Sequence, residues 1–114
     1  MEISSEMNDD LLVATVVAER IDAASAVLFK DTMRSILDGA PDTTVLDLDN
    51  VTFVDSSGLG AIVAAMKLVQ PGKRLVLAQL TPTVQRLFSL TRLDSVFEIV
   101  GDVADACDET RQAG

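Results

Sequence analysis

The sequence contains no histidine, and this absence excludes more chemistry than any other feature of its composition. Histidine is the commonest general base and the commonest zinc ligand, so Ser–His and Cys–His nucleophile pairs cannot form in this chain. Cys107 is the only cysteine, which rules out an intrachain disulfide and a cysteine-rich metal site. We interpret Cys107 as a small residue on the last helix, and we expect neither a metal nor a cofactor.

Tryptophan and tyrosine are also absent, and the four phenylalanines leave the core to be built mainly from aliphatic side chains. With 48% hydrophobic and 24% charged residues, the chain can still bury such a core. No apolar run reaches the ~18 residues that a membrane span needs, and the first ten residues lack the charged and apolar regions of a signal peptide. We therefore expect a soluble cytoplasmic protein without membrane insertion.

Positive charge is scarce, because nine Lys and Arg residues face 18 Asp and Glu residues and give a net charge of −9. Proteins that bind nucleic acid need basic residues to meet the phosphates, so we expect no nucleic-acid partner. An acidic protein of this kind suits a protein partner that carries basic residues.

The 114 residues fit one domain, 1–114, with a short strand or tail at 1–10 and an acidic helix at 101–114. Runs rich in β-branched residues alternate with segments of helical spacing, which is typical of βαβ units. The alternation predicts an α/β fold: a sheet of four or five strands, mostly parallel or mixed, flanked by about four helices. The expected strands cover 2–7, 11–18, 44–48 with 51–54, 74–79 and 96–100. The expected helices cover 23–38, 57–70, a segment from Pro82 for which Thr81 supplies a capping hydroxyl, and 102–111.

The most informative motif is DSSGLG at 55–60, which follows an apolar strand and precedes a helix. Backbone N–H groups at a helix N-terminus are unpaired and attract anions. Ser56 or Ser57 can therefore cap the helix, or one of them can receive a phosphate. Gly58 and Gly60 allow the helix to approach its neighbours closely and leave the turn uncovered. Both interpretations of the serines fit these residues.

A second polar loop, residues 19–22, follows the strand expected at 11–18. The carboxyl ends of parallel strands meet at one edge of a sheet, so we expect this loop and the serine turn to lie close together. Within the loop, Asp22 either caps the first helix or borders the site at the serine turn.

Motifs for catalysis are missing around the serines. The chain has neither the GxxxxGK[ST] pattern of a phosphate-binding loop nor the GxSxG pattern of a nucleophile elbow. Asp47 and Asp49 precede Asp55, but their spacing does not predict the convergent carboxylates of an aspartyl-phosphate site. We expect a protein that is not an enzyme.

The run VLDLDNVTFVDSSGLGAIVAAMK, together with the upstream block ERIDAASAVLFKDTM, resembles the STAS domain family and, within it, the bacterial anti-sigma-factor antagonists. The resemblance extends from about residue 11 to residue 100. It implies that the unphosphorylated protein binds an anti-sigma factor that is also a serine kinase and so releases the sigma factor. It further implies that phosphorylation of Ser57 ends this binding and that a phosphatase of the PP2C type restores it. ATP and metal would belong to those two enzymes.

The resemblance places Ser56, Asp55 and Asp22 beside Ser57, in support of the site, with Gly58 next to it. On the following helix, Leu59 and Ile62 are either core residues or an exposed docking surface. The alternative function is a constitutive STAS scaffold, or a regulatory subunit of a signalling or lipid-transport complex, that is not phosphorylated. We expect a monomer or a weak dimer.

Overall fold

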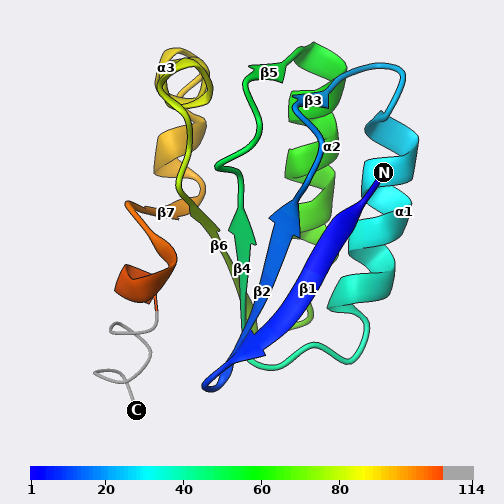
Figure 1. Cartoon of the computed structure of the whole chain (residues 1–114), viewed down its shortest axis with the longest axis vertical. Helices are drawn as coiled ribbons and strands as arrows, with labels where there is room; N and C mark the ends of the chain where they lie inside the picture. Colours follow the sequence, from blue (N-terminus) through cyan, green and yellow to red (C-terminus); the bar gives the residue numbers. More distant parts are fainter. Residues whose placement is uncertain (107–114) are drawn as a thin grey trace.

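The computed structural model describes residues 1–106 and has a five-stranded sheet at its centre (Figure 1). The strands lie in the order β1-β2-β4-β6-β7, with β1 antiparallel to β2 and every other neighbouring pair parallel. The predicted α/β fold with a mostly parallel sheet is therefore confirmed. The strands are β1 (Ile3–Asn8), β2 (Leu11–Val16), β4 (Thr43–Asp47), β6 (Arg74–Ala78) and β7 (Glu98–Val100).

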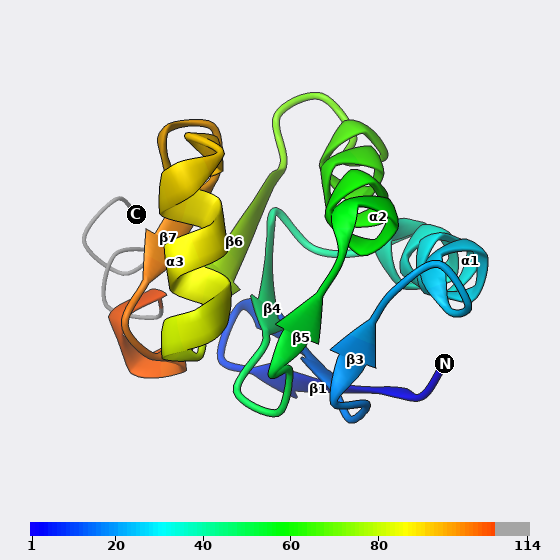
Figure 2. The ribbon, with the colours of Figure 1, turned by 90° about the horizontal axis from the view of Figure 1, so that it is seen from above.

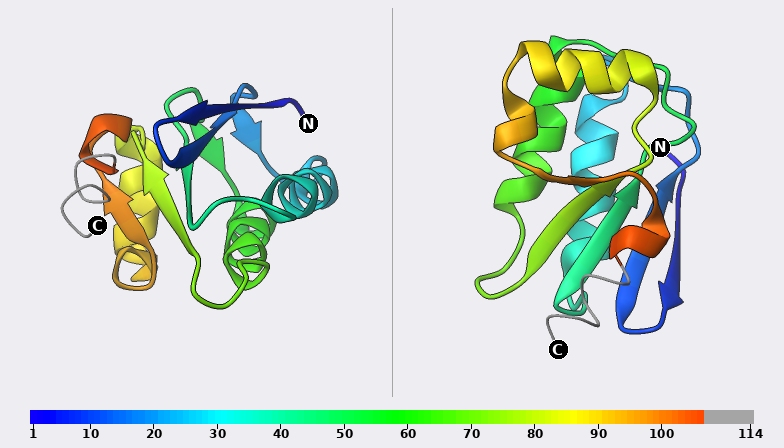
Figure 3. Two further views of the ribbon diagram at one scale, coloured as in Figure 1. Left: turned by 90° about the horizontal axis from the view of Figure 1, so that it is seen from below. Right: turned by 90° about the vertical axis from the view of Figure 1, so that its left-hand side faces the viewer.

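Three α-helices and a short 3-10 helix connect the strands. They are α1 (Ala26–Leu37), α2 (Ser56–Lys67), α3 (Pro82–Leu90) and η1 (Leu93–Ser95). Helices α1 and α2 pack side by side on one face of the sheet, and α3 lies across their direction (Figures 2 and 3). Residues 103–106 are also helical and Asp102 precedes them in a bend, whereas residues 107–111 of the helix predicted at 102–111, Cys107 included, lie outside the described residues.

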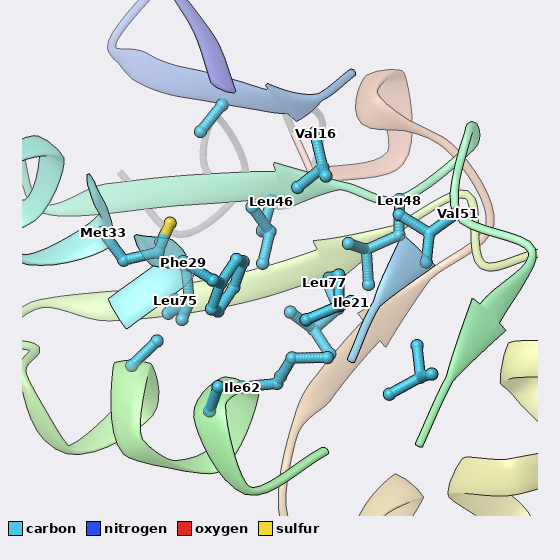
Figure 4. Close-up of a cluster of buried hydrophobic side chains, with 14 of the residues drawn as sticks. Val16, Ile21, Phe29, Met33, Leu46, Leu48, Val51, Ile62, Leu75 and Leu77 are labelled. Atoms are coloured by element: carbon cyan, nitrogen blue, oxygen red, sulfur yellow. The ribbon is translucent and has the colours of Figure 1, made fainter. Parts of the chain in front are cut away.

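Alternate residues of the central strands divide into two hydrophobic clusters. Leu46 and Leu77 are buried in the cluster on the side of α1 and α2, where Phe29 of α1 joins them (Figure 4). Val45 and Val76 belong to a second cluster that residues 103–106 help to cover. Because each face of the sheet is packed, β4 is buried along its whole length.

A second, two-stranded sheet lies beyond the carboxyl ends of β2 and β4. It consists of β3 (Arg20–Ile21) and β5 (Phe53–Val54), which run parallel and side by side (Figure 2). The prediction of a loop over 19–22 is wrong for β3, because two residues are too few to form a periodic pattern. This small sheet brings the polar loop before α1 next to the segment that enters α2.

The ends of the helices also differ from the prediction. The first helix begins at Ala26 and not at residue 23, because residues 22–25 form a hydrogen-bonded turn of their own. The residue before α3, Thr81, does not cap that helix with its side chain. Its hydroxyl donates instead to the carbonyl oxygen of Val51, 2.7 Å away, and so ties the start of α3 to the segment before β5.

Candidate functional site

Asp55, between β5 and α2, is the residue that caps α2. Its Oδ1 accepts a hydrogen bond from the N–H of Gly58 at 2.8 Å, and its carbonyl oxygen accepts one from the N–H of Leu59 at 2.8 Å. The prediction that Ser56 or Ser57 caps this helix is therefore wrong. An aspartate at this position also complements the positive end of the helix dipole.

Ser56 and Ser57 are the first two residues of α2, and both are exposed. Within residues 1–106, neither hydroxyl takes part in a hydrogen bond. Because Asp55 performs the capping, both hydroxyls are free to react with or bind to another molecule. Both candidate serines are therefore exposed at the start of the helix.

The Asp55 carboxylate also joins the two polar loops. Its Oδ2 accepts a hydrogen bond from the N–H of Ala23 at 3.1 Å, and its own N–H donates to the carbonyl oxygen of Ile21 at 3.4 Å. One side chain therefore contacts both the start of α2 and the loop that follows β3. The expected proximity of residues 19–22 to the serine turn is confirmed.

Asp22 holds the loop after β3 in shape. Its Oδ1 accepts hydrogen bonds from the N–H of Ala24 and from the hydroxyl of Ser25, both at 3.2 Å, and its Oδ2 lies 3.3 Å from Nε of Arg20. Asp22 is not the N-cap of α1, because that position belongs to Ser25. Burial acts to raise the pKa of the Asp22 carboxyl, but the hydrogen bonds from Arg20, Ser25 and Ala24 outweigh it and lower the pKa from 3.8.

Gly58 allows α2 to begin directly against β3. A Cβ atom at this position would lie 1.8 Å from the carbonyl oxygen of Ile21, far closer than atoms can approach. At Gly60, in contrast, a Cβ atom would meet nothing within 4 Å. The close approach predicted for both glycines is therefore confirmed for Gly58 and wrong for Gly60.

The two apolar residues predicted as a docking surface have different positions. Ile62 has 0% of its surface exposed and belongs to the core, so its assignment to a docking surface is wrong. Leu59 is half-buried and packs against the same core. A partner that approaches Ser57 can reach part of Leu59 but not Ile62.

Sequence reasoning missed an aromatic residue and a cation beside the site. The guanidinium of Arg20 lies over the ring of Phe53, with 4.2 Å between the Arg20 Cζ and the ring centroid. Phe53 is 40% exposed on β5, just before the serine turn. The two residues are 33 positions apart in the sequence, and only the pairing of β3 with β5 brings them together.

No group of three or more side chains suited to hold a metal ion occurs in the part of the chain that the structure describes. Nor does any helix within residues 1–106 combine the length and the apolar character that a membrane span requires. What the site offers is two exposed hydroxyls at a helix N-terminus, two carboxylates engaged in hydrogen bonds, and an exposed cation–aromatic pair. These groups suit modification and protein binding.

Comparisons with known proteins agree along most of the chain. The model of the STAS domain family matches residues 2–106. The anti-sigma-B factor antagonist of Listeria monocytogenes is 35% identical over 102 residues, which cover 87% of this chain and 90% of that protein. The anti-sigma F factor antagonist of Paenibacillus polymyxa is 36% identical over 66 residues, 57% of this chain and 56% of that protein. The crystal structure of an anti-sigma factor antagonist from Mycobacterium paratuberculosis has the same fold, with a TM-score of 0.85, 24% identity, and coverage of 96% of this chain and 93% of that one.

Proposed function

The chain belongs to the STAS domain family, and on this basis we propose that it is an anti-sigma factor antagonist whose binding is controlled by phosphorylation of Ser57. The observation that supports the proposal is the exposed Ser57 hydroxyl, which has no hydrogen-bond partner within residues 1–106 and lies at the start of α2. The names of the relatives indicate the class of partner, an anti-sigma factor. The resemblance of the serine turn indicates that this partner is also a serine kinase.

A phosphate on Ser57 would change binding more than folding. At the helix N-terminus its charge would be favoured by only ~0.3–1 kcal/mol, and the nearby carboxylates of Asp55 and Asp22 would oppose it by a comparable amount. Neither quantity unfolds a domain whose stability is several kcal/mol. Enclosed against a partner, however, an unpaired charge costs about 3–5 kcal/mol, which lowers affinity by roughly two to four decades.

The proposed cycle requires two other proteins. The anti-sigma factor would bring ATP and metal and transfer the phosphoryl group to Ser57, and a phosphatase of the PP2C type would remove it. This chain contributes the acceptor hydroxyl and the surface around it, and it has no catalytic role. Asp55 and Gly58 hold the acceptor in position through α2, since they fix where that helix begins.

The test combines phosphorylation and binding with a matched pair of serine variants. Wild type, Ser57→Ala and Ser56→Ala are incubated with the cognate anti-sigma factor kinase and ATP, and incorporation is measured by intact-protein mass spectrometry. We expect one phosphoryl group on wild type and on Ser56→Ala, and none on Ser57→Ala. Labelling of Ser57→Ala to the wild-type extent would refute the assignment of Ser57.

Binding to the kinase is then measured by calorimetry. Ser57→Ala should bind like the unmodified protein, whereas phosphorylated wild type should bind at least about a hundredfold more weakly. Ser57→Asp carries one charge where phosphate carries nearly two, so its effect should be smaller. Equal binding of the phosphorylated and unmodified forms would favour the constitutive scaffold.

A further inference from the structure

An apolar groove lies between β5 and α3, outside the residues that hold the serine turn together. Its volume is about 250 Å³, and its lining combines Phe53 of β5 with residues of α3. Leu90 of α3 is 76% exposed, which makes it the most exposed large hydrophobic residue of those described. The remaining lining residues are Val54, Thr83, Val84, Arg86 and Leu87.

The groove opens at the same edge of the molecule as Ser57. Phe53 belongs to β5, which leads through Asp55 into α2. Strand β5 lies between β3 and α3, and it contacts α2 as well (Figures 1 and 2). A partner bound over the serine turn would therefore be adjacent to the groove.

The charged residue that lines the groove is basic, although the protein as a whole is acidic. Residues 56–93 contain none of the 18 acidic residues of the chain but five of its nine basic ones. These five are Lys67, Lys73, Arg74, Arg86 and Arg92, of which Lys73 and Arg74 line a different cavity. Arg86 lines the groove, and Arg20 lies over the ring of Phe53 at its border. The groove is thus an apolar surface with basic residues beside it on an otherwise acidic protein.

We propose that this groove binds an amphipathic helix with acidic residues, contributed by the partner that recognises Ser57. Charge complementarity supports an acidic occupant, because a carboxylate beside its apolar residues would meet Arg86, whereas Arg20 at the border already pairs with Asp22. The spacing of Thr83, Leu87 and Leu90 supports a helical one, since residues three and four apart form a ridge along α3 on which another helix packs. The identity of this partner rests on the proposed function, whereas the chemistry of the groove does not.

The groove is tested first without any natural partner. The probe is a synthetic helix of about 18 residues with leucines at helical spacing and glutamates elsewhere, and the control replaces every glutamate with lysine. Binding to the ¹⁵N-labelled protein is followed by NMR. We expect the acidic peptide to shift the amides of Phe53, Leu87 and Leu90, and to bind at least roughly tenfold more tightly than the basic one.

Variants of exposed residues complete this test. Leu90→Gln and Arg86→Gln should each lower the affinity for the acidic peptide by roughly five- to tenfold. Leu28→Gln, at an exposed leucine on α1, should leave the affinity unchanged. Equal binding of the two peptides, shifts outside the groove, or shifts caused by raising the concentration of the protein alone would overturn the proposal, the last by showing that a second copy is the occupant.

The same variants separate this proposal from the proposed function. Leu90→Gln should weaken the complex with the anti-sigma factor kinase while phosphorylation of Ser57 still reduces the binding that remains. If Leu90→Gln has no effect on that complex and the peptide does not bind, the groove proposal fails and the function stands. If the peptide binds the groove but Ser57 is never phosphorylated, the proposed function fails alone.

Discussion

The five-stranded sheet and the two-stranded β3–β5 sheet are stabilised by different interactions. In the first, both faces of β4 and β6 are covered by hydrophobic side chains. In the second, two residue pairs are held by the Asp55 carboxylate and by the close approach of Gly58 to Ile21. The larger sheet gives the domain its stability, whereas the smaller one determines where the exposed serines lie. Substitutions in the two regions should therefore differ in both size and kind of effect.

The largest effect is expected in the core of the five-stranded sheet. Leu77→Ala removes a fully buried side chain and should lower the free energy of unfolding by about 2–5 kcal/mol. The control Leu90→Ala alters a leucine that is largely exposed, and it should change the free energy of unfolding by no more than about 0.5 kcal/mol. Urea unfolding followed by circular dichroism measures both, because the chain has no tryptophan for fluorescence. Similar losses in the two variants would contradict the core assignment of Leu77.

The second effect concerns the contact between α2 and β3. Gly58→Ala should destabilise the protein by about 1–3 kcal/mol, because the added methyl group forces the helix away from the Ile21 carbonyl. Gly60→Ala is the matched control on the same helix and should stabilise by up to about 1 kcal/mol through helix propensity. Both are measured by urea unfolding. If the two variants shift stability in the same direction, Gly58 does not lie as close to the Ile21 carbonyl oxygen as described.

A smaller loss of stability is expected when the Asp55 carboxylate, which joins the two polar loops, is removed. Asp55→Ala should destabilise by about 1–2 kcal/mol, since it deletes the cap of α2 and leaves the Ala23 N–H without its partner. Hydrogen exchange at Ala23 and Gly58 should become faster. Asp49→Ala, at an exposed aspartate just after β4, should change neither quantity. Unaltered exchange at Ala23 in Asp55→Ala would show that the hydrogen bond from the Ala23 N–H to the Asp55 carboxylate does not form in solution.

The smallest effect is expected from the titration of Asp22. Its pKa is lowered from 3.8 in the folded protein, so its contribution to stability is present above pH 3.8 and disappears as the pH falls through the folded pKa. NMR titration of the carboxyl carbon should give a value below 3.8 for wild type. In Arg20→Gln the value should rise, because a hydrogen bond to the carboxylate is lost. A value at or above 3.8 in wild type would contradict the described turn.

The larger sheet could be predicted from the sequence because its strands are long enough to show a pattern. The apolar runs that begin near Leu11 and Arg74 predict β2 and β6, and the three- and four-residue spacing of Phe29 and Met33 predicts α1. These signals arise from burial, which repeats with the period of each element. Gly39 and Pro41 mark the end of α1 through backbone conformation, because Gly39 has a φ of 78° and proline cannot continue a helix.

The smaller sheet could be predicted only in part, because its contacts join residues far apart in the sequence. Nothing local shows that Asp55 rather than Ser56 caps α2, since both residue types are good caps. Nor does helical spacing decide that Ile62 is buried while Leu59 is partly exposed; the position of α2 against β3 decides it. The proximity of the two loops was predictable, because parallel strands end at a common edge.

The mixed topology of the large sheet has a consequence for the order of folding. Among the strand pairs of residues 1–106, only β1 and β2 are joined by a tight turn, at residues 9–10, and such hairpins form on the order of 1–10 μs. Strands β3 and β5 instead come from opposite sides of α1 and β4, so their pairing must wait until that long loop has closed. We therefore expect the serine turn to acquire its final geometry after the β1–β2 hairpin has formed. A kinase that requires this geometry would act on the completed domain and pass over nascent chains.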